Sequence, residues 1–248
     1  MRYKVVCQFK GYHYAGWQIQ TEAYTLQQAI QETLYKITKS SITIVGCSRT
    51  DAKVSANDFV FHFDSPIEIE PDSYKLALNR TLPKDIHVKH MEIVDESFHA
   101  RFNSKLKVYR YTIEMGEYNI FEHEYIYQLN QPLDLELCKQ TLDIFVGTHD
   151  FTSFNTTPLN VQKNQVRTIT FASLQQIDSK VIIEIQGNGF LHHMVRMIVQ
   201  TIIEVGKHRI SVVDVKAMLE AKSKEVCRYK APAEGLCLER VDYEQTIN

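Results

Sequence analysis

The order of strand-like and helix-like segments constrains this chain most, because the same order occurs twice. In the first hundred residues, hydrophobic patterning predicts a strand over 3–9, a helix beginning after Thr25, strands over 41–46 and 57–64, a helix beginning at Pro71, and a strand over 86–94. Thr25 followed by Gln28 also predicts a capping box at the start of the first helix. This β-α-β-β-α-β order is that of a split βαβ unit, as in ferredoxin-like folds.

The remaining residues repeat this order. The predicted segments are a strand over 105–114, a helix over 135–145, strands over 166–175 and 180–187, helices over 190–205 and 211–221, and a strand over 236–243. The sequence therefore predicts an α+β protein made of two ferredoxin-like (RRM-like) subdomains, residues 1–100 and 101–248. We expect their mainly antiparallel sheets to be joined and a cleft to lie between them.

Composition is that of an ordinary globular protein. The chain has 248 residues, of which 44% are hydrophobic and 23% charged, so it can bury a substantial core. No apolar run approaches the roughly 20 residues of a membrane helix, and the N-terminal residues lack the long apolar segment of a signal peptide. We therefore expect a cytoplasmic protein with no membrane association.

The cysteines and histidines do not suggest a metal site. The five cysteines are scattered and include no Cys-x-x-Cys pair, which argues against both a disulfide framework and a zinc site. His192 and His193 are adjacent, and on a helix their side chains would point about 100° apart. Because that arrangement makes a poor pair of ligands, we predict no metal.

Charge is distributed unevenly along the chain, although the formal net charge is only −2. The segment 99–110 contains four basic residues and no acid, namely Arg101, Lys105, Lys107 and Arg110. The segment 196–230 contains eight basic and four acidic residues, a local balance of +4. Basic residues on one face can bind phosphates, so we expect contacts with nucleic acid from both segments, with Lys222 and Lys224 as peripheral charges. The alternative is an ordinary solvated surface.

Asp51 is the carboxylate most favourably placed for chemistry. It lies in the segment 46–56, between the predicted strands and close to Arg49. A carboxylate in such a turn can be held rigidly and still be open to a ligand. Asp also commonly bonds nearby backbone N–H groups in turns without any further role. The segment alone leaves both interpretations open.

Motifs along the whole chain favour the chemical interpretation. Arg49-Thr50-Asp51-Ala52 resembles the nucleophile motif of the tRNA pseudouridine synthase A family. Further matches follow in the family's order: Tyr14-Ala15-Gly16-Trp17-Gln18, Thr25-Leu26-Gln27, Asn79-Arg80-Thr81-Leu82-Pro83, Phe98-His99-Ala100-Arg101-Phe102, Tyr109-Arg110-Tyr111, Gly147 with Asp150-Phe151-Thr152-Ser153-Phe154, Gly189-Phe190-Leu191-His192-His193-Met194-Val195-Arg196, and Ala231-Pro232-Ala233-Glu234-Gly235-Leu236. The resemblance extends from about residue 3 to residue 243, and an ordered set of this length is highly specific.

The resemblance implies an activity and its partners. It implies a homodimeric isomerase that converts uridine to pseudouridine at positions 38, 39 and 40 of the tRNA anticodon stem-loop, without a cofactor. It also implies roles for side chains of the site: nucleophile (Asp51), ion-pair partner of the nucleophile (Arg196), base stacking or proton transfer (Tyr109), apolar wall beside the base (Leu236), and support of a flipped nucleotide (Arg49). Arg167 is a further candidate for a phosphate contact or for support of the site.

Two residues depart from the family's motif. Lys53 replaces a glycine and Ser55 replaces a histidine. If the backbone at residue 53 has a positive φ, lysine there costs about 1 kcal/mol relative to glycine. Neither change removes a proposed catalytic group. Two alternatives remain: the same reaction on a different RNA, or a non-catalytic RNA-binding protein, since ferredoxin-like sheets also build RNA-recognition modules.

Overall fold

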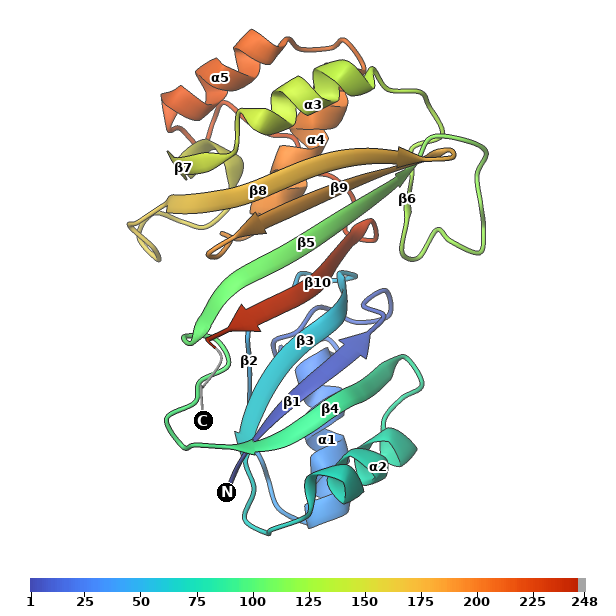
Figure 1. Cartoon of the computed structure of the whole chain (residues 1–248), viewed down its shortest axis with the longest axis vertical. Coiled ribbons are helices and arrows are strands. Elements are labelled where there is room, and N and C mark those ends of the chain that lie inside the picture. Colours follow the sequence, from blue (N-terminus) through green and yellow to red (C-terminus); the bar gives the residue numbers. More distant parts are fainter. Residues whose placement is uncertain (245–248) are drawn as a thin grey trace. The chain divides into compact units, whose positions relative to one another are not determined.

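A computed structural model describes residues 1–244, and the chain forms two compact units (Figure 1). The first unit comprises Met1–Lys105 together with the segment from Cys237 onward, and the second comprises Leu106–Leu236. Both units contain helices and mainly antiparallel strands, so the protein is of mixed α+β class. The sequence-based division placed everything after residue 100 in one subdomain, whereas here the C-terminal strand belongs with the first unit.

The first unit is built around a central strand. Its elements are β1 (Arg2–Phe9), α1 (Leu26–Thr38), β2 (Ile44–Gly46), β3 (Ser55–Asp64), α2 (Pro71–Thr81), β4 (Ile86–Val94) and all of β10 (Leu236–Tyr243) except its first residue. Strand β1 lies between β3 and β4 and is antiparallel to both. Strand β2 pairs with β3 in antiparallel fashion, and β10 pairs with the beginning of β3 in parallel fashion.

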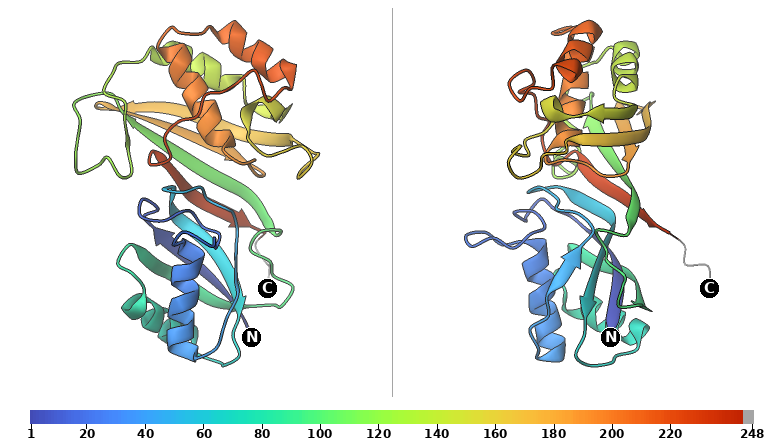
Figure 2. Two further views of the ribbon diagram at one scale, coloured as in Figure 1. Left: turned by 180° about the vertical axis from the view of Figure 1, so that it is seen from behind. Right: turned by 90° about the vertical axis from the view of Figure 1, so that its left-hand side faces the viewer.

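Helix α1 supplies much of the core of the first unit. Leu26, Ile30 and Leu34 recur at helical spacing and are fully buried, while the opposite face of the helix is polar. The helix lies along the strands of this unit, as the reverse view shows (Figure 2). Only half of the predicted capping box is present, because the Thr25 side chain accepts a bond from the Gln28 backbone N–H (3.3 Å) but the Gln28 side chain donates to Glu32.

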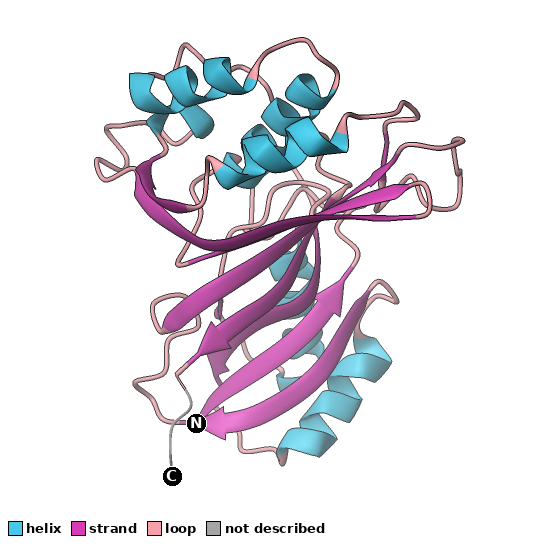
Figure 3. Ribbon diagram, turned by 45° about the horizontal axis from the view of Figure 1, so that its top comes forward, coloured by secondary structure: helices cyan, strands magenta, loops and turns pink. Residues whose placement is uncertain are grey.

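The second unit has a longer set of antiparallel strands covered by helices. Its elements are β5 (Ser104–Glu114, from Leu106), β6 (Tyr127–Gln128), α3 (Leu135–Asp143), β7 (Gly147–Asp150), a 3₁₀ turn (Thr152–Phe154), β8 (Val166–Ile177), β9 (Lys180–Gly187), α4 (Met194–Gly206) and α5 (Val212–Ala221). Strand β9 lies between β5 and β8, and β7 pairs with β8. The three helices gather on one side of β8 and β9 (Figure 3).

Two features of the second unit differ from the sequence-based expectation. The helix predicted over 190–205 begins only at Met194, because His193 has a left-handed backbone (φ 62°) that a continuing α-helix does not accommodate. The short strands β6 and β7 were not predicted, because runs of two and four residues carry too little alternation to be recognised. Among residues 1–244, no helix combines the length and the apolar character that crossing a membrane requires.

A buried histidine should make the first unit sensitive to acid. His62 on β3 is only 4% exposed and accepts a hydrogen bond from the Ala100 backbone N–H through Nδ1 (3.1 Å). Burial, followed by the positive charges of Arg2 and His99, lowers the pKa of His62 from 6.5 to about 4. As pH falls below 6.5, His62 binds a proton in the unfolded chain but stays neutral in the folded chain. The free energy of unfolding therefore decreases between pH 6.5 and pH 4.

We predict that replacing His62 weakens this acid sensitivity. The measurement is the free energy of unfolding in urea at pH 7 and at pH 4.5. In His62→Asn, which retains a hydrogen-bond acceptor, the decrease of this free energy from pH 7 to pH 4.5 should be about 2 kcal/mol smaller than in wild type. His87→Asn, at an exposed histidine of β4, should leave the loss unchanged. An equal acid sensitivity in wild type and His62→Asn would contradict the prediction.

Candidate active site

The loop that carries Asp51 is held in the first unit by the segment around Gly16. The Trp17 backbone N–H donates to Thr50 O (3.1 Å), and the Lys53 N–H donates to Tyr14 O (3.2 Å). Gly16 has φ 95°, and a Cβ there would lie 2.6 Å from Thr50 O, so this approach of two backbones requires glycine. Asp51 is half-buried in this loop, and its carbonyl accepts a bond from the Val54 N–H (3.2 Å).

The core of the first unit in turn fixes this bracing segment. The Trp17 ring is 3% exposed and stacks on Phe59 of β3, with ring centroids 4.1 Å apart. Gly46 leaves room for the indole, since a Cβ on Gly46 would lie 2.7 Å from Trp17 atoms. The Tyr14–Trp17 motif therefore has a physical reason: it connects the Asp51 loop to a packed aromatic cluster.

Both departures from the family motif are accommodated in this loop. Lys53 has φ 68°, so this position does have the positive φ that the glycine of the family motif suggested. The Lys53 ammonium lies over the Tyr12 ring, 4.8 Å from the centroid. The Ser55 hydroxyl accepts a hydrogen bond from the Gly11 backbone N–H (3.0 Å), so serine also fastens the loop to the bracing segment.

Arg49 lies on the exposed side of the same loop, near a second arginine. Partial desolvation, followed by the charge of Arg49, lowers the pKa of Arg101. The other basic residues of the segment 99–110 are less available than the sequence suggested. Lys107 is only 9% exposed, and Lys105 pairs with Glu244 (2.7 Å).

Arg196 is fastened in the second unit to the loop 231–235. Its Nε donates to Ala231 O (2.8 Å), and its own carbonyl accepts a bond from the Ala231 N–H (3.0 Å). The side chain projects from the first turn of α4 and is half-buried. The backbone bond holds Ala231 against the helix, and the bond from Nε then fixes the direction of the guanidinium. A solvent-exposed arginine on a helix would have no such fixed direction.

The loop 231–235 leads directly into Leu236, the first residue of β10, and is held by Tyr111. The Tyr111 hydroxyl donates to Pro232 O (2.8 Å), and the Thr112 N–H donates to Gly235 O (2.9 Å). Tyr111 is fully buried, which raises the pKa of its hydroxyl, and a Cβ on Gly235 would lie 2.6 Å from its ring. Leu236, 5% exposed, follows directly. No role was assigned to Tyr111 from the sequence, and the only signal for this contact was its place in the Tyr109-Arg110-Tyr111 motif.

Tyr109 and Arg167 flank the segment 189–190. Tyr109 on β5 is 7% exposed and packs edge-to-face against Phe190, with centroids 5.1 Å apart. Arg167 on β8 is half-buried, which lowers its pKa, and its Nη1 donates to Val166 O (2.6 Å). A Cβ added to Gly189 would lie 4.0 Å from Arg167 Nε. The second unit thus links Arg196 with Leu236 through one loop and Tyr109 with Arg167 through another.

Two expectations for this unit were wrong. His192 and His193 precede α4 rather than lying on it, so their side chains do not diverge: the rings stack with centroids 3.7 Å apart, and both Nδ1 atoms lie within 2.9 Å of the Thr156 hydroxyl. The geometric argument against this pair as metal ligands therefore does not apply. Lys224 is not a peripheral charge, because its Nζ donates to the carbonyl and the side-chain oxygen of Asn155 (2.9 and 2.7 Å).

Comparison with known proteins identifies the class and then the family. A family model described as tRNA pseudouridine synthase matches residues 142–244, and relatives with that activity match nearly the full length, so the class of protein is an isomerase that forms pseudouridine. The tRNA pseudouridine synthase A of an Exiguobacterium species is 39% identical and that of Clostridium acetobutylicum 38%, with at least 97% of each chain covered. The enzyme of the same name from Limosilactobacillus reuteri is 39% identical, over 98% of this chain and 96% of its own. The chain belongs to the tRNA pseudouridine synthase A family.

We predict that restoring the family's glycine at residue 53 stabilises the protein. Because Lys53 has φ 68°, Lys53→Gly should raise the free energy of unfolding by about 1 kcal/mol in urea unfolding. Lys53→Ala is the matched control, because it removes the same ammonium but keeps a Cβ at positive φ and so should bring no gain. Equal gains in both variants would trace the effect to the lysine side chain and contradict the prediction.

Proposed function

We propose that this protein isomerises uridine to pseudouridine at positions 38, 39 and 40 of the tRNA anticodon stem-loop, with Asp51 as the nucleophile. The observation that carries the proposal is the construction of the Asp51 loop. Its backbone is fastened to the motif around Gly16 at both Thr50 and Lys53, which is a far stronger constraint than an ordinary surface turn needs. A carboxylate that must meet a sugar carbon in one orientation benefits from such rigidity.

The reaction determines what the side chains have to supply. The N1–C1′ bond of the uridine breaks, the uracil turns, C5 joins C1′, and the C5 proton is lost while N1 gains one. Nothing is oxidised and no group is imported, so neither a redox cofactor nor a metal is needed. A carboxylate can hold the intermediate as in retaining glycosidases, and Asp51 has that role here.

The remaining roles belong to residues of both units. Arg196 keeps the Asp51 carboxylate ionised and aimed, a role favoured by the bonds between Arg196 and Ala231. Tyr109 stacks on the uracil or takes part in moving the C5 proton, and Leu236 covers the base from another side. Arg49 supports the nucleotide after it leaves the helical stack, and Arg167 supports the segment beside Tyr109.

The proposal is tested first at Asp51. Asp51→Asn keeps the size of the side chain but removes its charge, so pseudouridine formation should fall by more than about a thousandfold while tRNA binding is largely retained. The measurement is mass-spectrometric mapping of pseudouridine in three unmodified tRNA transcripts, each with uridine at one of positions 38, 39 and 40. Substantial turnover by Asp51→Asn would refute the nucleophile, and modification only outside these positions would favour a different RNA target.

Arg49 should affect the rate rather than the affinity. Flipping the nucleotide precedes chemistry, so Arg49→Ala should lower turnover at saturating tRNA by about tenfold or more. Lys222→Asn is the comparison, because Lys222 is an exposed cation and asparagine tolerates its positive φ of 45°. That variant should weaken tRNA binding and reduce its salt dependence by about one unit, with little effect on saturated turnover. If Arg49→Ala changes only the apparent affinity, Arg49 is a phosphate contact.

The proposed assembly is a homodimer in the cytoplasm, as the family resemblance implies. One tRNA would then meet surfaces of two copies of the chain. Light scattering at working concentration should give twice the mass of the chain. A fully active species with the mass of one chain would refute the dimer.

A further inference from the structure

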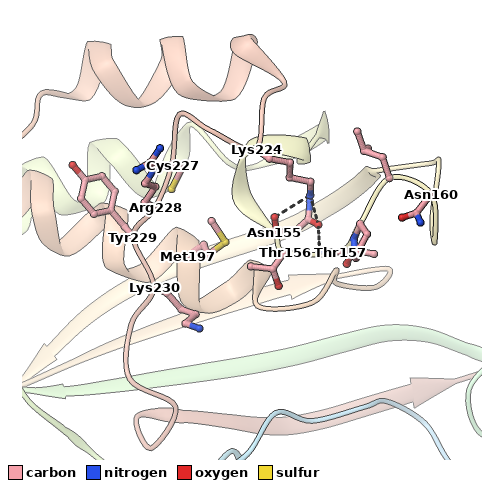
Figure 4. A pocket seen from close by; sticks show the side chains of 12 residues that line it. Asn155, Thr156, Thr157, Asn160, Met197, Lys224, Cys227, Arg228, Tyr229 and Lys230 are labelled. Carbon is pink, nitrogen blue, oxygen red and sulfur yellow. Dashed lines mark hydrogen bonds between the residues drawn. The ribbon is translucent and has the colours of Figure 1, made fainter.

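A pocket of about 540 Å³ opens in the second unit, and none of the residues given a role in the reaction lines it (Figure 4). Its walls are the segments 155–160 and 227–230. Lys224 and, from α4, Met197 also line it. This volume lies within the range of pockets that hold a small ligand. All of the lining residues belong to the second unit, so the pocket is formed by that unit alone.

The charge of the pocket is entirely positive. Lys224, Arg228 and Lys230 are among its lining residues, and no acidic residue is. Lys224 is committed to the wall, because it holds Asn155 by two hydrogen bonds (2.9 and 2.7 Å). Arg228 and Lys230 are exposed, and within residues 1–244 neither has an ion pair or side-chain hydrogen bond. Two unneutralised cations beside a polar cavity attract an anion.

The walls of the pocket are continuous with the candidate active-site residues of this unit. Lys230 directly precedes Ala231, which is bonded twice to Arg196, and Met197 directly follows Arg196. On the other wall, the Thr157 hydroxyl accepts a bond from the His192 N–H (3.1 Å), and Thr156 bonds the imidazoles of His192 and His193. A ligand in the pocket would therefore lie close to Arg196, the proposed partner of the nucleophile.

We propose that this pocket binds a nucleotide of the RNA strand adjacent to the target uridine, with its phosphate between Arg228 and Lys230. The proposal rests on the proposed function and adds a second RNA subsite to it. Tyr229, which also lines the pocket, offers a ring on which a base can stack, and Met197 offers an apolar surface. A phosphodiester supplies an anion for these cations, and the polar side chains of Thr157 and Asn160 in the pocket wall suit a ribose.

Removal of single charges tests the phosphate contact. Lys230→Ala and Arg228→Ala should each weaken binding of an unmodified tRNA transcript about fivefold and reduce the slope of log affinity against log salt by about one. Lys139→Ala is the matched control, because Lys139 is an exposed cation of α3 in the same unit that lies outside both basic segments and does not line the pocket. It should bind tRNA as wild type does. Wild-type salt slopes in both pocket variants would overturn the proposal.

Photocrosslinking tests the position of the nucleotide. A photoreactive phenylalanine analogue at Leu159, which is 51% exposed and lines the pocket, should crosslink the same transcript next to the modified uridine. The same analogue at Val213, 73% exposed on α5, should not. If the wild-type enzyme modifies the transcript but the Leu159 probe gives no crosslink near the target, the pocket is wrong and the proposed function stands. If the wild-type enzyme does not modify tRNA, the proposed function itself fails.

Discussion

The approach of the Gly16 backbone to Thr50 is the contact on which the candidate nucleophile depends. With 2.6 Å between Thr50 O and the place a Cβ would occupy, no other residue fits at this point without moving the loop. The position of Asp51 is therefore fixed by a segment that begins more than thirty residues earlier in the chain, and that segment is fixed by the stacking of Trp17 on Phe59. The Asp51 loop is therefore held in place by a packed aromatic core.

The second unit uses a different device to the same end. A loop without regular structure, 231–235, is fastened by the buried hydroxyl of Tyr111, by one backbone bond from Thr112, and by Arg196. Each bond satisfies a loop carbonyl that would otherwise be costly to bury. One consequence is that Leu236 and Arg196 are positioned by the same few contacts, so a change in the loop would be felt by both.

Much of the fold could be predicted from the sequence, because long amphipathic segments such as Leu26–Thr38 carry a clear period. The positive φ at Lys53 could be anticipated from the glycine in the family motif. What could not be predicted depends on distant partners. Nothing local distinguishes Lys224, which is bound to Asn155, from an exposed lysine. The stacking of His192 on His193 likewise depends on a left-handed residue that helical patterning does not reveal.

The pairing of the C-terminal strand with the first unit has a consequence for synthesis. Cys237 and Leu238 pair with Ser55 and Ala56, the two residues directly after the Asp51 loop, and the Tyr243 hydroxyl bonds Ala100 O (2.6 Å). The ribosome must therefore complete the whole second unit before the first unit receives its last strand. A nascent chain that has already formed the Asp51 loop still lacks the strand beside it. The enzyme is thus assembled at the end of translation, and a truncated product would leave the edge of β3 exposed next to Asp51.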